Sequence, residues 1–259
     1  MQRTNYRDVN YDDVTYSLRN DFAESHTRFW HRLQQPGSWF TSAERIAIAQ
    51  ATRDARHCPL CQQRKQALSP RAITGTHLNE TSLRTPIVDV VHTIATDASR
   101  ITESWYQAHL NKNQTDNRLT EAEYIEIVGT VVAMVSIDSF ADALGISHRP
   151  LPETIDTSEP DYYVPATASV TDDAWVPMLA KENADTPEAD LWPSGKTGNV
   201  IRAMSLVPNE VRTLNDLSAV HYLPNAKVRQ HGVDAGRTLN RSQMELVAGR
   251  VSALNACYY

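Results

Sequence analysis

The chain has 259 residues, a hydrophobic fraction of 41% and a formal net charge of −6 at pH 7. This length fits one large domain or two small ones and allows a sizeable core. The negative charge argues against a general nucleic-acid-binding protein, which would show a basic patch. No apolar run of about eighteen residues predicts a transmembrane helix, and the first residues lack the apolar segment of a signal peptide. We therefore expect a cytoplasmic protein without nucleic-acid or membrane partners.

The residue pattern predicts helices rather than strands. The chain has only nine glycines, and no alternating segments are joined by hairpin turns. Apolar residues at helical spacing predict helices over 20–34 and 86–96. Capping boxes begin two more helices at 41–44 and at 120–123. The last of these runs to residue 144 and is apolar nearly all round, which is typical of a central, buried helix. The expected fold class is all-α.

A proline-rich stretch divides the chain. Seven of the thirteen prolines lie between Pro150 and Pro193, which predicts a long extended connection. Within it, the segment DDAWVPML has the apolar residues to dock on a core. Helical patterns resume after Gly198. The predicted parts are an N-terminal extension (1–37), a first helical half (38–149), the connection (150–197) and a second helical half (198–259).

The two halves share a motif, seen in TSAERIAIAQATRDARHCPLC and RSQMELVAGRVSALNACYY. Each has a cap, a glutamate, an alanine-rich apolar stretch and a cysteine. Fourteen positions separate Glu44 from Cys58, and twelve separate Glu245 from Cys257. The motif predicts an internal duplication. Each glutamate has two possible roles. It closes a capping box, Glu44 with Thr41 and Glu245 with Ser242, or it relays protons to the cysteine that follows.

Cys58 and Cys61 form a Cys-x-x-Cys pair that indicates redox or metal chemistry in a reducing compartment. The proline between them, at the first position of a helix, places Cys58 near the N-cap, where free N–H groups and the helix dipole stabilise a thiolate. Arg56, His57 and Lys65 add positive charge nearby. A thiolate of this kind attacks peroxide oxygen, and a second thiol resolves the sulfenic acid.

Two other interpretations of this pair stay open. A Cys-x-x-Cys is half of a zinc site, and His57, His77 and His92 are near enough in sequence to complete one, although the spacing matches no common zinc finger. The two cysteines could also be purely structural.

Several segments resemble the alkylhydroperoxidase D-like, carboxymuconolactone decarboxylase-type superfamily. RTLNRSQMELVAGRVSALNACYY is similar to its core, and WVPML and NVIRAMSLVPNEV to its peroxidase-related branch. CPLCQQRKQALSP, VVHTIATDASRITESWY and YIEIVGTVVAMVSIDSFADALG resemble a two-half group of alkylhydroperoxidase-related proteins, some of which are selenoproteins. The resemblance spans residues 38–259. It implies a duplicated all-α helical bundle, assembly into homo-oligomers, and reduction of peroxides with electrons from a dithiol protein.

Members of this superfamily use a glutamate, a Cys-x-x-Cys and a histidine four residues beyond it. By resemblance, Glu245 matches the glutamate and Cys257 the first cysteine. The second cysteine would follow Tyr259, so the second half is expected to be truncated. We expect that the next codon encodes selenocysteine and was read as a stop. An engineered truncation, a frameshift and a natural pseudo-domain are the alternatives.

In the first half, Cys58 and Cys61 match the pair, Lys65 stands at the histidine position, and Glu44 is displaced by two residues. The resemblance thus implies a thiol-dependent peroxidase without metal or organic cofactor. The expected catalytic residues are Cys58, Cys61, Glu245 and Cys257. The expected supporting residues are Glu44, His57, Lys65 and His92.

Two further hypotheses compete with the peroxidase. The same fold supports decarboxylase or lyase chemistry, in which Glu126, Asp138 and His92 would do acid–base work, because fold does not decide function. Alternatively, the chain is a non-catalytic or redox-sensing oligomeric subunit whose sites have decayed.

Overall fold

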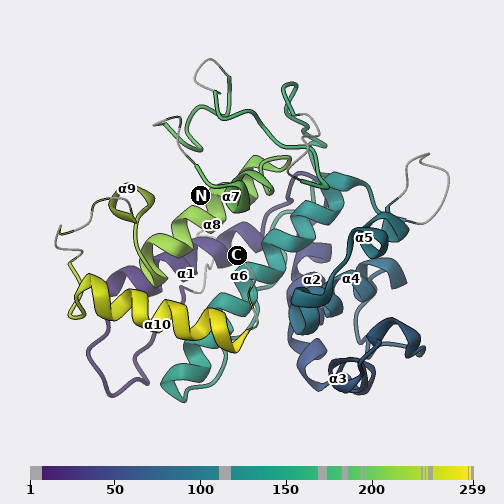
Figure 1. Cartoon of the computed structure of the whole chain (residues 1–259), viewed down its shortest axis with the longest axis horizontal. Coiled ribbons are helices and arrows are strands. Elements are labelled where there is room, and N and C mark those ends of the chain that lie inside the picture. Colours follow the sequence, from purple (N-terminus) through teal and green to yellow (C-terminus); the bar gives the residue numbers. More distant parts are fainter. Residues whose placement is uncertain are drawn as a thin grey trace.

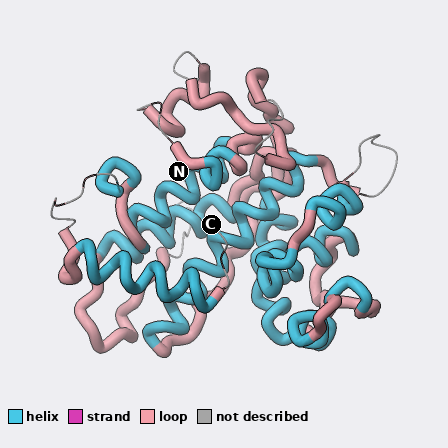
Figure 2. Tube along the Cα trace, in the orientation of Figure 1, coloured by secondary structure: helices cyan, strands magenta, loops and turns pink. Residues whose placement is uncertain are grey.

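The computed structural model of the chain describes residues 8–110, 118–168, 174–182, 186–193, 195, 197–228, 230, 232, 236–255 and 257. Over these residues the regular structure is entirely helical, as predicted, and the only strand-like feature is an isolated bridge between Leu110 and Leu119. Figures 1 and 2 show the helices gathered around one long member. The elements are α1 (Asn20–Leu33), α2 (Ser42–Asp54), η1 (Ala55–His57), α3 (Pro59–Gln66), η2 (Pro70–Ala72), α4 (Thr85–Asp97), η3 (Ala98–Arg100), α5 (Glu103–His109), α6 (Glu121–Leu144), α7 (Asn199–Arg202), α8 (Pro208–His221), α9 (Asn225–Val228) and α10 (Arg241–Leu254).

Helix α6 is the central element. It packs against α2, α4 and α8, which explains why it is apolar on nearly all sides. A capping box of Thr120 and Glu123 begins it, and Gly145, in the left-handed conformation with φ of 69°, ends it. By length and composition alone α6 could cross a membrane, but core helices pass the same test, and half of its most apolar stretch is buried inside the fold.

The helix predictions from periodicity and capping are confirmed to within a residue or two for α1, α4 and α6, and the capping box of Thr41 and Glu44 begins α2. The predicted capping box of Ser242 and Glu245 is wrong. Asn240 caps α10 instead, and its box closes with Gln243. The sequence offers both frames, because asparagine caps as well as serine and glutamine closes a box as well as glutamate.

The proline-rich connection has no regular helix among its described residues, yet it docks on the core. It runs along the top edge of the molecule, green in Figure 1 and pink in Figure 2. As expected for DDAWVPML, apolar side chains of this segment are buried, although Trp175 itself is 44% exposed. The residues of the connection that belong to the main hydrophobic core are Val176, Met178, Leu179, Leu191 and Trp192.

Helix α10 lies on the outside of the fold (Figure 1) and has no buried residue. Its counterpart in the sequence motif, α2, is in the core and has six buried residues. The two copies of the motif are therefore in different environments.

Three buried charged side chains join α2, α6 and α8. Nε of Arg45 lies 3.3 Å from Oε1 of Glu126, and Nη2 of Arg45 lies 3.5 Å from Oε1 of Glu210. The backbone N–H of Trp39 donates to Glu126 over 2.7 Å. Burial raises the pKa of Glu126 to about 8 and raises the pKa of Glu210 as well, although Arg45 opposes both shifts. One guanidinium thus faces two carboxyl groups, of which at least one is held protonated at neutral pH.

Two glycines leave room for these carboxyl groups. A Cβ atom at Gly37 would lie 1.7 Å from Oε1 of Glu126, and one at Gly129 would lie 2.2 Å from Oε2 of Glu210. Neither carboxyl group can move away easily, because both are buried beside Arg45. The absence of a side chain at these two positions is therefore required by the ion cluster.

Candidate metal centre

The cysteine pair lies where η1 passes into α3. Cys58 is the N-cap of α3 and the next residue, a proline, occupies its first turn, as predicted. Cys61 follows one turn later, so both sulfurs face the same neighbours. Both are free thiols and almost inaccessible, with Cys58 0% and Cys61 4% exposed.

Two histidines complete the cluster. His92 comes from α4 and is fully buried, and His77 comes from the irregular segment between η2 and α4. Nδ1 of His77 lies 3.5 Å from Sγ of Cys58 and 3.4 Å from Sγ of Cys61. Nδ1 of His92 lies 3.3 Å from Sγ of Cys61. All four donor atoms lie within 4.8 Å of one another, so four metal-ligating side chains converge on one point.

Asp89 on α4 orients His77. Its Oδ1 accepts a hydrogen bond from Nε2 of His77 over 2.7 Å, which leaves Nδ1 directed at the sulfurs. The carboxylate also accepts from His109 (2.7 Å) and Arg64 (2.8 Å). Burial disfavours the charge on Asp89, but these three donors outweigh it and hold the pKa of the carboxyl group well below its usual range. Such a carboxylate behind a histidine is typical of metal sites.

The two thiols differ in their acidity. Burial would raise the pKa of Cys58, but hydrogen bonds from the backbone N–H groups of Cys61 and Leu78, together with the contact with Nδ1 of His77, lower it to about 7. Burial, followed by the neighbouring Cys58, raises the pKa of Cys61 to about 12. For His92, burial and then His77 lower the pKa to about 4, so its imidazole is neutral at neutral pH and can accept a metal.

The positive residues expected around the pair lie elsewhere. Arg56 pairs with Asp142 over 2.6 Å, and the side chains of His57 and Lys65 are exposed. The groups beside the sulfurs are instead His77 and His92. Of the three histidines that the sequence places near the pair, His77 and His92 contact the sulfurs and His57 is exposed.

Glu245 and Cys257 are not brought to this cluster. Glu245 is exposed on α10, where its Oε1 accepts hydrogen bonds from Tyr222 and Arg241, each over 2.5 Å. Cys257 is exposed just beyond the same helix. In Figure 1, α10 runs from the lower left to the middle of the molecule, and α3 lies at the lower right. Any site built on Glu245 and Cys257 is therefore separate from the one at Cys58 and Cys61.

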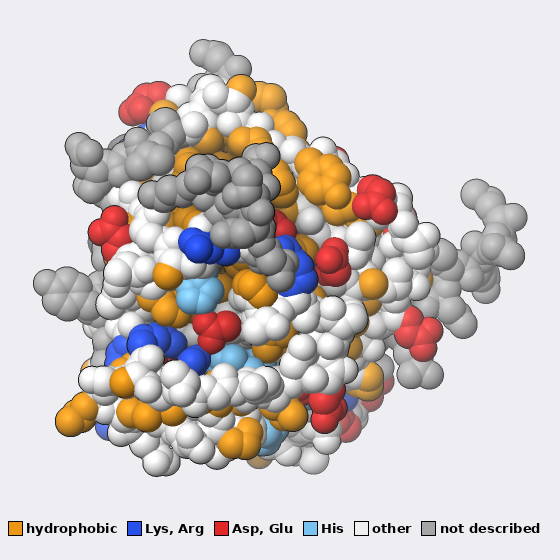
Figure 3. Space-filling model, turned by 90° about the vertical axis from the view of Figure 1, so that its right-hand side faces the viewer, with side chains coloured by type: hydrophobic (Ala, Val, Ile, Leu, Met, Phe, Trp, Pro, Cys, Tyr) orange, Lys and Arg blue, Asp and Glu red, His pale blue; other side chains and the backbone are white. Residues whose placement is uncertain are grey.

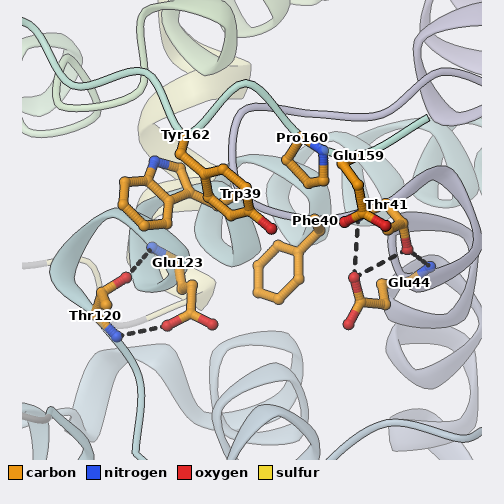
Figure 4. Close-up of a pocket in the computed structure, with 9 residues that line it drawn as sticks. All are labelled: Trp39, Phe40, Thr41, Glu44, Thr120, Glu123, Glu159, Pro160 and Tyr162. Atoms are coloured by element: carbon orange, nitrogen blue, oxygen red, sulfur yellow. Dashed lines mark hydrogen bonds between the residues drawn. The ribbon is translucent and has the colours of Figure 1, made fainter. Parts of the chain in front are cut away.

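Glu44 has a capping role. Its carboxylate accepts hydrogen bonds from the backbone N–H and the hydroxyl of Thr41, over 3.0 and 2.9 Å. It also lines a cavity of about 500 Å³ where the first turns of α2 and α6 meet, with Glu123, Trp39 and Tyr162 (Figure 4). Cys58 follows the opposite end of the 13-residue helix α2, about 20 Å away along its axis.

The residues suggested for decarboxylase or lyase chemistry have separate partners. Arg53 makes a bidentate ion pair with Asp138, over 2.8 and 2.9 Å. Glu126 belongs to the Arg45 cluster, and His92 contacts Cys61. Each of the three side chains is engaged in a different contact.

The cluster of two cysteines and two histidines lies behind a cavity at the surface of the molecule. Figure 3 shows the side that carries α3, α4 and α5, where histidine, acidic and basic side chains lie next to one another. A cavity of about 570 Å³ opens there, and its polar lining includes Arg64, His77, Asp89 and His109. Solvent thus reaches the outer side of His77 and Asp89, while the sulfurs are behind them.

Comparison with known proteins adds no identification, because neither a family model, nor a curated protein, nor a solved structure matches the chain. The function therefore has to be argued from the geometry of the site.

Proposed function

We propose that Cys58, Cys61, His77 and His92 bind one Zn²⁺ ion in a tetrahedral centre. The observation that carries this proposal is the convergence of four donor atoms within 4.8 Å of one another, with three of the four sulfur-to-nitrogen separations at 3.3 to 3.5 Å. Tetrahedral zinc with Zn–S near 2.3 Å and Zn–N near 2.0–2.1 Å places sulfur and nitrogen ligands about 3.5 Å apart. The donor set, two thiolates and two neutral imidazoles, is also one that zinc prefers.

The centre would be structural. Four protein ligands fill a tetrahedral shell and leave no position for a substrate. The apolar cluster around the site is small: Cys58, Leu60 and Cys61 are its buried members, and Ile73 and Leu78 pack against it. A metal ion would therefore supply much of the cohesion that fixes α3 and the segment after η2 to α4.

Metal content tests this proposal. Protein purified with zinc should retain about one Zn²⁺ per chain, and Co²⁺ in its place should give the visible spectrum of a tetrahedral thiolate site. Cys58→Ser and His77→Ala should each lose the ion. His57→Ala and Cys257→Ser change exposed residues of the same types and should retain it. Full zinc content in Cys58→Ser, or none in the parent protein, would disprove the centre.

A second candidate function, thiol-dependent reduction of hydroperoxides, is favoured by two free thiols one helical turn apart. The backbone N–H of Leu78 donates to the sulfur of Cys58 over 3.4 Å, and Nδ1 of the neutral His92 lies 3.3 Å from the sulfur of Cys61. The Cys58 thiolate would attack the O–O bond, releasing an alcohol and forming a sulfenic acid. Cys61 would displace water from it to form a disulfide, which a dithiol protein would reduce. The alkylhydroperoxidase resemblance implies the same chemistry and a homo-oligomer.

Zinc-free protein with a hydroperoxide and dithiothreitol tests this second function. If Cys58 and Cys61 are the reacting pair, Cys58→Ser should abolish peroxide consumption and Cys257→Ser should leave it unchanged. The reverse result would assign the activity to the second half of the chain. A lack of turnover in all three proteins would remove the peroxidase and leave the metal centre as the function of the cluster.

A further inference from the structure

Four polar side chains form a continuous hydrogen-bonded chain on the side of α6 that faces α1 and α8. The hydroxyl of Ser136 lies 3.3 Å from Nδ1 of His221, and Nε2 of His221 lies 2.7 Å from Nε2 of His26. Nδ1 of His26 lies 2.5 Å from the hydroxyl of Tyr11. His26 is 0% exposed. The chain thus links α6, α8, α1 and the segment before α1; we call it the Ser136–Tyr11 relay.

Both histidines of the relay are neutral. Burial, followed by the neighbouring His221, lowers the pKa of His26 to about 3, and burial and then Arg19 lower the pKa of His221 to about 4. The rings of Phe22 and Phe140 pack against both imidazoles. A neutral imidazole has one donor and one acceptor nitrogen, so all the hydrogen bonds of the relay must point in the same direction along it.

The relay can have either direction. If Tyr11 donates to His26, then His26 donates to His221, and His221 donates to Ser136. If Ser136 donates to His221, every bond is reversed and Tyr11 accepts. The hydroxyl at the Ser136 end can therefore serve a further partner as a donor or as an acceptor.

The Ser136 end of the relay opens into a cavity of about 150 Å³ between α6 and α8. Its apolar lining is made by Val132, Ala133, Met204, Leu214 and Leu217. Ser136, His221 and Tyr222 are among its polar lining residues, and Tyr222 is held at one side by its hydrogen bond to Glu245. An apolar cavity of about this volume accepts a molecule the size of benzene.

The other two hydroxyl groups of the lining have partners within α8. Thr213 donates to the carbonyl of Asn209 over 2.9 Å, and Ser218 donates to the carbonyl of Asn215 over 3.4 Å. Ser136 and His221 are the lining groups that are connected to the buried relay. The cavity thus combines apolar walls with one polar position whose hydrogen-bonding direction is adjustable.

We propose that this cavity binds a benzene-sized molecule that carries one hydroxyl group, with the hydroxyl hydrogen-bonded to the hydroxyl of Ser136, which His221 connects to the relay. A hydroxyl group both donates and accepts, which suits a relay that can do either. This site is independent of the proposed metal centre at α3 and α4, because none of the three cysteines lines the cavity.

Binding of phenol and of benzene to the full-length protein, followed by NMR, tests the proposal. Phenol should bind more tightly than benzene and should shift the ring resonances of His221 and His26 together. Ser136→Ala should weaken phenol binding about five- to tenfold, as expected for one neutral hydrogen bond, and leave benzene binding unchanged. Ser139→Ala, an exposed serine on the same helix, should change neither.

The test also has a blocking variant. Val132 lines the cavity and is 38% exposed, so Val132→Phe should close the cavity without disturbing the core and abolish binding of both ligands. The proposal is overturned if phenol and benzene bind equally, if neither binds, or if Ser136→Ala and Ser139→Ala behave alike.

Discussion

Chelation of zinc should loosen α3 and the segment up to His77 while the main helical core stays folded. Zinc present at about a thousandfold excess over its dissociation constant stabilises the bound form by about 4.1 kcal/mol. The apolar cluster of Cys58, Leu60 and Cys61 is small and separate from the main core. Removal of the ion should therefore destabilise this part of the chain and leave the main core folded. Backbone hydrogen exchange between residues 59 and 78 should accelerate about a thousandfold when the ion is removed.

Hydrogen-exchange mass spectrometry with and without a chelator measures this effect. Peptides from α6, which packs in the main core, serve as the internal reference. His77→Ala should exchange fast in the 59–78 segment under both conditions, whereas His57→Ala should respond to the chelator as the parent protein does. If the chelator leaves the segment unchanged, or accelerates exchange equally throughout the chain, a local structural metal does not explain the site.

Local sequence signals were sufficient for most of the helical core. Periodicity and capping boxes predicted α2 and α6 because each box involves residues only three positions apart. The proline after Cys58 likewise predicted the N-cap position of that cysteine. The misplaced start of α10 shows the limit of this approach, since two overlapping frames satisfy the same capping rule and the structure uses the one of Asn240 and Gln243.

The cluster of Cys58, Cys61, His77 and His92 depends on contacts that no local pattern encodes. His77 belongs to an irregular segment without periodicity, and its contact with Cys58 spans 19 positions. His26 and His221 are 195 positions apart, so the relay was not predicted at all. The resemblance directed attention to Lys65, because it occupies the family's histidine position, whereas the fold supplies histidines from outside that motif.

Replacing Arg45 with methionine should be among the most destabilising single changes in this protein. Arg45 lies between the buried carboxyl groups of Glu126 and Glu210 and is within 3.5 Å of both. Removing one partner of a buried ion pair costs about 3–5 kcal/mol, because the remaining charge has no compensation. Arg28→Ala is the matched control: that guanidinium pairs with Asp216 at the surface and is 48% exposed, so its loss should change the free energy of unfolding by about 1 kcal/mol or less.

The loss of stability caused by Arg45→Met should be larger at higher pH, because the two buried glutamates ionise as the pH rises. The pKa of Glu126 is raised from 4.5 to about 8 in the folded protein. A carboxyl group whose pKa is raised by folding contributes stability at pH values below its pKa in the unfolded chain. This contribution is lost as the pH rises through its pKa in the folded protein. Arg45 lowers the pKa of both glutamates, so without it both must stay protonated to remain buried. Urea unfolding should therefore show a larger loss at pH 8 than at pH 5.5, and an equal loss at both would mean that packing of the Arg45 side chain, rather than charge, holds α2, α6 and α8 together.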